Sequence, residues 1–200
     1  MKAFTTALAA MVASVEASKI YGSCQEPEVQ QNFDLNRYLG LWYESRRDTD
    51  CAYESGICVT ASYSMNADGT VRVRNNEWME ETNEWSGGTG QAFEVDPSKD
   101  EGYLKVKFGR FIPAGDYKIL ETDYDNYTVV YGCSGIPNTY NIEYAWILTR
   151  DANPSQAIVD KGLEVIHTKI PTYNMSALYA TPTGDAALSN GGDCPYESEP

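Results

Sequence analysis

The sequence predicts an all-β protein: an eight-stranded antiparallel up-and-down β-barrel with one C-terminal α-helix packed on the outside. Between residues 40 and 151, short segments alternate apolar and polar residues, and turn-forming residues separate them. After Pro154 the apolar spacing changes to that of a helix. The length of 200 residues fits one domain with a sizeable core. Eight antiparallel strands with one apolar face close into a barrel because closure leaves no strand edge unpaired.

The strands are expected in hairpin order. In the segment 70–79, Val71 and Val73 should face inward while Arg72 and Arg74 face outward, because successive side chains of a strand point to opposite faces. Gly69 supplies the positive φ of the tight turn before that segment. The eight expected strands are 40–48, 58–65, 70–79, 89–95, 102–109, 116–122, 127–134 and 143–150.

The helix and the tail follow the barrel. Pro154 suits the first turn of a helix, and apolar residues follow at helical spacing to near Lys169, so one face of this helix should lie on the barrel. We assign residues 18–180 to the barrel and helix. The tail 181–200 is rich in Gly, Ser, Asp and Pro, so we expect poor order except where Cys194 tethers it.

The first residues have the composition of a signal peptide. Lys2 precedes an apolar stretch from Phe4 to Val15, and small residues stand where a signal peptidase reads, so cleavage is expected after Ala17. Residues 1–17 are therefore interpreted as a leader, and the mature protein as secreted and extracellular. The alternative is a buried N-terminal helix.

Composition argues against several functions. A net charge of −14 repels phosphate backbones, which argues against nucleic acid as a partner. There is one histidine, His167, and no CxxC motif, which argues against a zinc site. A Ser-His-Asp triad would need His167, which lies in the expected surface helix without a GxSxG motif near any serine. The five cysteines of a secreted chain predict disulfides with one thiol left over, but their spacing alone does not give the pairing.

Three short motifs carry a resemblance to a known family. Gly40-Leu41-Trp42 opens the first strand, Thr122-Asp123-Tyr124 stands at a hairpin turn, and Arg150 closes the last strand. In this order and spacing they resemble the three signatures of the lipocalin family. The stretches CQEPEVQQNFDLNRYLGLWYE, GICVTASYSM, TDYDNYTVVYGCS and YAWILTRD are similar to its apolipoprotein D-like subgroup, from about Cys24 to Cys194.

The resemblance implies structural roles. It implies the disulfides Cys24–Cys133 and Cys58–Cys194, and it leaves Cys51 as the odd thiol. It also implies that Trp42 lies across the closed floor of the barrel, with Arg150 stacked on its face.

The function implied is an extracellular carrier that binds a small hydrophobic ligand (a sterol, retinoid, fatty acid or pigment) inside the barrel, with no cofactor or metal and no catalysis. Alternation along the strands, read outward from Arg150, places several aromatic and polar side chains in the upper interior. The expected ligand-binding residues are Asn75, Tyr63, Phe108, Tyr117, Tyr144, Trp146 and Leu148.

Cys51 leaves two alternatives open. Some lipocalins, such as the prostaglandin D synthases, are thiol enzymes, so the alternative function is a thiol-dependent enzyme acting on a lipid through Cys51. The acidic neighbours Asp48 and Asp50 disfavour a thiolate, whereas Arg46 and Arg47 favour one. Cys51 is also a candidate for a disulfide to a partner or to a second copy of the chain, which would make the protein an interaction module.

Two surface features complete the expectations. Phe111 and Ile112 form an apolar loop tip at the open end of the barrel, which either touches a lipid surface or packs over the ligand. Asn126 and Asn174 begin glycosylation sequons.

Overall fold

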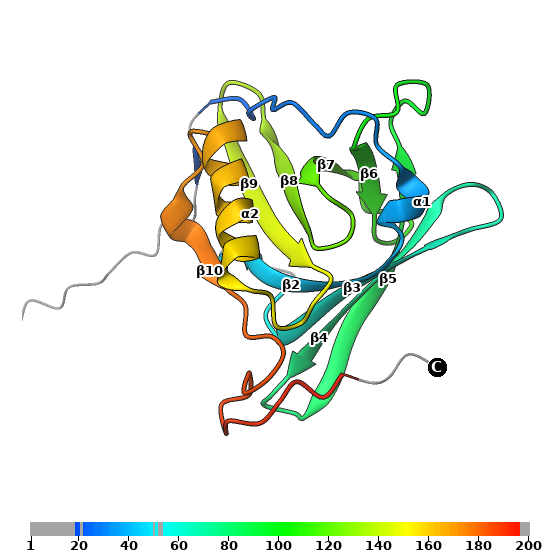
Figure 1. Cartoon of the computed structure of the whole chain (residues 1–200). Helices are drawn as coiled ribbons and strands as arrows, with labels where there is room; N and C mark the ends of the chain where they lie inside the picture. Colours follow the sequence, from blue (N-terminus) through cyan, green and yellow to red (C-terminus); the bar gives the residue numbers. More distant parts are fainter. Residues whose placement is uncertain (1–18, 21, 50, 52–53, 197–200) are drawn as a thin grey trace, which may run out of the picture.

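The computed structural model describes residues 19–20, 22–49, 51 and 54–196, and it confirms the expected barrel and helix (Figure 1). The expected leader 1–17 lies outside the described residues. Each barrel strand pairs antiparallel with the next along the chain, and β2 pairs with β9 to close the barrel. The barrel strands are β2 (Gly40–Asp48), β3 (Ile57–Met65), β4 (Val71–Met79), β5 (Glu84–Glu94), β6 (Tyr103–Lys107), β7 (Gly115–Thr122), β8 (Tyr127–Ile136) and β9 (Tyr140–Thr149).

Closure of the barrel depends on β2, which changes partner along its length. Its first half pairs with β3, from Gly40 opposite Tyr63 to Tyr43 opposite Thr60. On its other edge it pairs with β9, and the register shifts between Glu44 and Arg46. This β-bulge adds one residue to β2, so it resets which side chains face inward.

Some strand ends differ from the expectation. The segment 84–88 is the start of β5 rather than a loop, because the hairpin continues to the cross-strand pair of Trp78 and Trp85, whose ring centroids lie 5.5 Å apart. The turn between β4 and β5 is therefore only 80–83. Likewise β8 and β9 run on to Ile136 and Tyr140, so their hairpin turn is also shorter than expected.

Two short strands and a short helix were not predicted. Strand β1 (Lys19–Ile20) adds to β9, and β10 (Leu178–Ala180) pairs with the second half of β2. Helix α1 (Leu35–Tyr38) forms because the Asp34 carboxylate caps it, accepting from the backbone N–H groups of Asn36 and Arg37. Helices this short lack a detectable periodicity in sequence.

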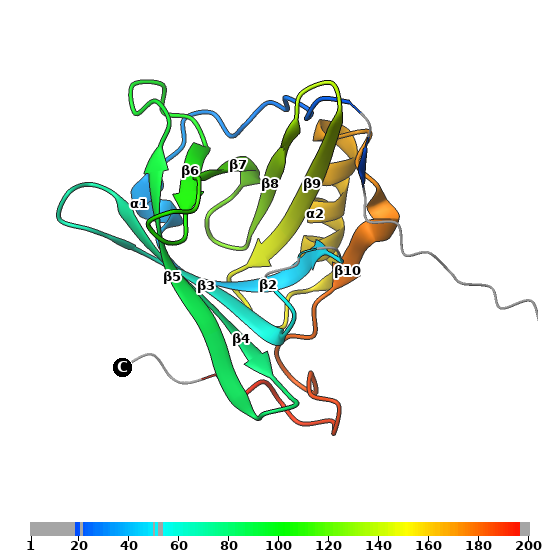
Figure 2. The same cartoon turned by 180° about the vertical axis from the view of Figure 1, so that it is seen from behind.

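Helix α2 (Gln156–Lys169) lies on the outer face of β8 and β9, as Figures 1 and 2 show from opposite sides. Val159, Val165 and Ile166 are buried against the sheet. A Cβ at Gly162 would lie 2.8 Å from the Ile147 side chain, so glycine allows the close approach of helix and strand. No helix in the described part of the chain is long and apolar enough to span a membrane.

The described part of the tail contacts the barrel at several points. Behind β10, Thr181 is buried and the Pro182 carbonyl accepts from the Cys58 N–H, 2.8 Å away. The segment then runs beside the open end of β4 and β5 (Figure 2) to the Cys58–Cys194 disulfide. Its described part, through Tyr196, thus fills the place where β2 and β3 separate.

Candidate functional site

The floor of the barrel interior is Trp42, which has no exposed surface. The Arg150 guanidinium carbon lies 3.7 Å from the centroid of its ring. The same guanidinium donates to the carbonyls of Leu41 at 2.7 Å, Leu39 at 2.8 Å and Arg37 at 3.0 Å. The Arg150 side chain therefore connects the end of β9 to the segment at the start of β2, and it closes this end of the barrel.

Gly40 is required at this floor for two reasons. Its φ is +95°, a conformation that side chains other than glycine rarely adopt. A Cβ there would also lie 3.3 Å from Nη1 of Arg150. The glycine of the first signature thus makes room for the arginine of the third.

The second signature builds the neighbouring turn between β7 and β8. Asp123 Oδ1 accepts from the backbone N–H groups of Asn126 at 2.8 Å and Tyr127 at 3.1 Å. The Thr122 hydroxyl donates to the Tyr127 carbonyl, and the Tyr124 carbonyl accepts from Arg150 Nε at 2.9 Å. All three signatures therefore meet at the closed end, in structural roles.

Three tyrosine hydroxyls meet above the floor. The hydroxyl of Tyr117 on β7 lies 2.9 Å from that of Tyr63 on β3 and 2.9 Å from that of Tyr38. Burial raises the pKa of Tyr38 to about 12, so the hydroxyls stay protonated at neutral pH. Tyr63 and Tyr117 are among the expected ligand-binding residues. Tyr38 is not, because it belongs to the short helix that the sequence did not reveal.

The wall nearer the open end is formed by the inner face of β9. Leu148 is buried in the interior cluster and Trp146 packs against it. Tyr144 stacks on Trp146, with ring centroids 5.8 Å apart. The Trp146 indole N–H donates to the Glu54 carboxylate at 2.9 Å, so the loop between β2 and β3 reaches over the wall.

The opposite wall is formed by β4 and β5. Asn75 pairs with Ala61 and shares its inward face, and among the described residues its buried Oδ1 has no hydrogen-bond partner. Phe108 lies over Gly88 and Gly90, which leave its ring room on β5. All seven expected ligand-binding side chains therefore stand on the inner face of the barrel, or in the case of Phe108 directly beside it.

A buried carboxyl–guanidinium contact in this interior was not anticipated. Glu44 faces inward in step with Trp42, the bulge turns Arg47 to the same side, and Arg47 Nη1 lies 3.0 Å from Glu44 Oε1. The Thr181 hydroxyl donates to the same oxygen at 2.6 Å. Burial and the nearby Glu54 carboxylate raise the pKa of Glu44 to about 8, against the opposing effect of Arg47. No sequence signal marks this pair, since alternation from Trp42 would point Arg47 outward and only the bulge turns it inward.

Cys51 belongs to the loop between β2 and β3, and its side chain is buried. Its thiol donates to the Glu54 carboxylate at 3.2 Å. The Asp48 carboxylate accepts from the Tyr173 hydroxyl on the outside of the barrel, and Arg47 is bonded to Glu44 and to the Gly56 carbonyl. Of the four neighbours weighed for Cys51, Asp48, Arg47 and Arg46 are thus bonded to other groups, Arg46 to the Ser45 carbonyl at 2.7 Å, and Asp50 lies outside the described residues.

The other four cysteines form two disulfides, Cys24–Cys133 and Cys58–Cys194, the pairs that the resemblance implied. Each closes a loop of more than a hundred residues, which in the chain-entropy treatment stabilises by roughly 4–5 kcal/mol. The first ties the N-terminal segment to β8, and the second ties the tail to β3.

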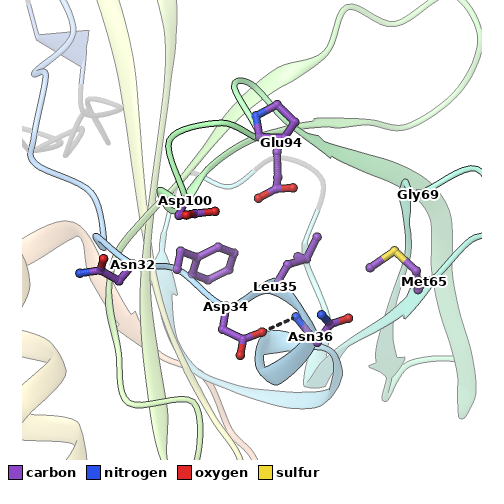
Figure 3. Close-up of a pocket in the computed structure, with 10 residues that line it drawn as sticks. Asn32, Asp34, Leu35, Asn36, Met65, Gly69, Glu94 and Asp100 are labelled. Carbon is purple, nitrogen blue, oxygen red and sulfur yellow. Dashed lines mark hydrogen bonds between the residues drawn. The ribbon is translucent and has the colours of Figure 1, made fainter.

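A hollow of about 580 Å³ lies outside the barrel, at its closed end (Figure 3). Leu35 and Met65 line it together with the carboxylates of Glu94 and Asp100. Phe33 belongs both to its lining and to the interior cluster, so this ring separates the hollow from the interior. The hollow is therefore distinct from the expected ligand site.

The remaining predicted residues lie on the surface. Phe111 is 92% exposed and Ile112 57% exposed, in the loop between β6 and β7. The side chains of Asn126 and Asn174 are exposed, on the turn after β7 and just before β10.

Comparisons with known proteins agree with this geometry. A family model described as a Lipocalin-like domain matches residues 33–183. Apolipoprotein D of Macaca fascicularis is 37% identical over 157 residues, covering 76% of this chain and 80% of that protein. The outer membrane lipoprotein Blc of Vibrio cholerae is 39% identical over 157 residues, covering 78% and 86%. The crystal structure of lobster apocrustacyanin A1 has the same fold, with a TM-score of 0.70 at 21% identity over 86% of this chain and 94% of that one. The chain therefore belongs to the lipocalin family and resembles its apolipoprotein D-like members.

Proposed function

We propose that the protein is an extracellular carrier that binds a small hydrophobic ligand (a sterol, retinoid, fatty acid or pigment) inside the barrel. The observation that carries the proposal is the composition of the inner wall. Aromatic and aliphatic side chains dominate it, while the three tyrosine hydroxyls and the Asn75 carbonyl provide a few polar groups. Such a wall is typical of sites that hold an apolar molecule and orient its polar end.

The buried Asn75 oxygen indicates which chemical groups the ligand should carry. A buried acceptor without a donor costs free energy, and a ligand hydroxyl or N–H at that position would offset the cost. The tyrosine hydroxyls are able to donate to a carbonyl or carboxylate of the ligand. We therefore expect ligands with one polar end to bind more tightly than pure hydrocarbons.

Tryptophan fluorescence tests the carrier function. Titrating the oxidised protein with a sterol, a retinoid, a fatty acid and a bile pigment is expected to give saturable quenching with at least one of them. The quenching should largely disappear in Trp146→Phe, since this indole stands in the inner wall. The control is Trp78→Phe. The Trp78 ring packs on Trp85 at the outer face of the barrel, so its replacement should leave the quenching intact. A flat titration for all four ligands would contradict the proposal.

The thiol-dependent enzyme is the less favoured function. The carboxylate of Glu54 accepts from the Cys51 thiol, and a negative charge at this distance favours the protonated sulfur over the nucleophilic thiolate. The burial of Cys51 also argues against a disulfide to a partner. The contacts thus favour carriage without catalysis.

The exposed loop tip is proposed to touch a lipid surface, from which ligand enters the barrel. Phe111 and Ile112 project from the loop before β7, and Ile136 and Tyr140, both exposed, stand on the hairpin of the adjacent strands β8 and β9. These four exposed apolar side chains on two loops are a surface that water disfavours, and are here called the patch. The patch lies at the open end, where a ligand would pass from a membrane into the interior.

Vesicle flotation tests this contact. The double variant Phe111→Ser/Ile112→Ser is expected to bind neutral phosphatidylcholine vesicles several-fold less than the parent protein, since it removes most of the apolar area. Phe93→Ser, an exposed residue of β5, is the matched control and should bind as the parent does. Equal binding of parent and double variant would contradict the contact.

We also propose that Asn126 and Asn174 carry glycans when the protein passes through a eukaryotic secretory pathway. Both side chains are exposed, and Asn126 lies at the closed end, so a glycan there leaves the open end clear. A mass loss on treatment with an N-glycosidase, absent in Asn126→Gln/Asn174→Gln, would support this.

A further inference from the structure

A second hollow, of about 490 Å³, lies on the outer face of β2, β3 and β4. Its side chains alternate with inward-facing residues such as Ala61 and Val73, so they point away from the barrel interior. The hollow therefore shares its strands with the interior site but opens on the opposite face of the sheet.

The depth of this hollow comes from the size of its side chains. Thr60 and Ser62 of β3 have short side chains that form the base. Tyr43 stands beside Thr60 on β2, and Arg74 stands beside Ser62 on β4. Short hydroxyl residues between long ones leave a trough lined with hydrogen-bonding groups.

One end of the trough is aromatic and is completed by the tail. The Tyr196 ring meets the edge of Tyr43, with centroids 4.9 Å apart, and lies nearly parallel to Trp85 at 6.2 Å. Its hydroxyl lies 2.6 Å from that of Thr183. The disulfide at Cys194, two residues earlier, fixes this part of the tail on the barrel.

The other end of the trough is cationic. Arg72 and Arg74 project from the same face of β4, and both are exposed. Arg72 lies between Ser64 of β3 and Gln91 of β5. Arg74 lies between Ser62 and Thr89 of the same two strands, so all four cross-strand neighbours are neutral. Two guanidinium groups with neutral neighbours are unusual on a chain of net charge −14.

We propose that this arginine–aromatic groove (Tyr43, Thr60, Ser62, Arg72, Arg74, Trp85 and Tyr196) is a second binding site, which takes a flat aromatic molecule with an anionic group. The aromatic end stacks the ring system of the ligand, and the guanidinium groups pair with its carboxylate, sulfate or phosphate. The hydroxyls of the base bond to polar substituents. The volume falls in the range of small-molecule sites.

Isothermal titration calorimetry with naphthalene-2-sulfonate tests the proposal. The parent protein is expected to bind one equivalent in this groove, and Arg72→Gln/Arg74→Gln to weaken that binding by roughly tenfold or more, because both ion pairs are lost. Lys99→Gln/Lys161→Gln is the matched control: it removes the same charge from two exposed lysines elsewhere, and it should weaken binding by less than about twofold.

The aromatic end is tested separately. Tyr196→Ala and Cys58→Ser/Cys194→Ser are each expected to lower the affinity for the probe several-fold. Tyr196→Phe keeps the ring and should bind the probe as the parent does. No heat of binding in the parent would overturn the proposal. So would binding that is equally tight in the arginine double variant and the lysine control, because the probe would then occupy the barrel interior or another site. The variants keep the two sites apart: quenching by a ligand in the interior is lost in Trp146→Phe and kept in Arg72→Gln/Arg74→Gln, whereas binding in the groove is weakened only by the arginine double variant.

Discussion

Replacing Trp42 with alanine is expected to lower the free energy of unfolding by about 3–5 kcal/mol, the usual cost of removing a large buried aromatic side chain. The ring has no exposed surface, and its N–H donates to the Tyr38 carbonyl at 2.9 Å. Removal also deprives the Arg150 guanidinium of the face on which it stacks. Both the cavity and the loosened cation would weaken the closed end.

Urea denaturation followed by far-ultraviolet circular dichroism measures this effect. The control is Trp85→Ala, which removes a half-exposed indole from the outer face and should cost much less. Equal midpoints for Trp42→Ala and the parent would show that the closed end contributes little to stability, contrary to the geometry.

Stability is expected to fall between about pH 4.5 and pH 8 because of Glu44. Its pKa is about 8 in the folded protein and has a reference value of 4.5. Below this range the carboxyl is protonated in both the folded and the unfolded protein, and the stability that it contributes is fully present. As the pH rises, the unfolded chain releases the proton first, so folding loses free energy until the folded-state pKa is passed. The full change is on the order of 5 kcal/mol.

The variant Glu44→Gln isolates this contribution. The amide stays neutral at every pH and still accepts from Thr181, so the difference in unfolding free energy between variant and parent should grow in favour of the variant from pH 5 to pH 9. Glu28→Gln, on an exposed side chain, should follow the parent across the range. A pH-independent difference for Glu44→Gln would mean that Arg47 keeps the carboxylate ionised in the folded state.

The barrel strands and the outer helix could be predicted from the sequence because they rest on local patterns. Alternation in 70–79 placed Val71 and Val73 inside, and the periodicity after Pro154 placed the helix within a residue or two of its observed bounds. Trp42 and Arg150 came from the resemblance, since no local pattern brings two residues 108 positions apart into contact.

The polar part of the interior was missed for a physical reason. Alternation assumes one residue per strand position, and the bulge after Glu44 breaks that assumption, so Arg47 turns inward to the side on which Glu44 already stands. Tyr38 was missed because a four-residue helix redirects its side chain into the barrel. The wall made by Tyr196 depends on where a disulfide fixes an irregular tail, which spacing does not determine.

The distance in sequence between β2 and its partner strand β9 determines when the barrel can close during synthesis. Strand β2 pairs with β9, where Tyr43 and Thr149 lie 106 residues apart, and Cys58 waits for a partner 136 residues later. The ribosome therefore releases the first hairpins with one edge of β2 open, and they stay open for the several seconds that the intervening chain needs to be made. Shielding of this strand edge, and delay of the oxidation of Cys58 until Cys194 has been made, are therefore expected to raise the yield of folded protein.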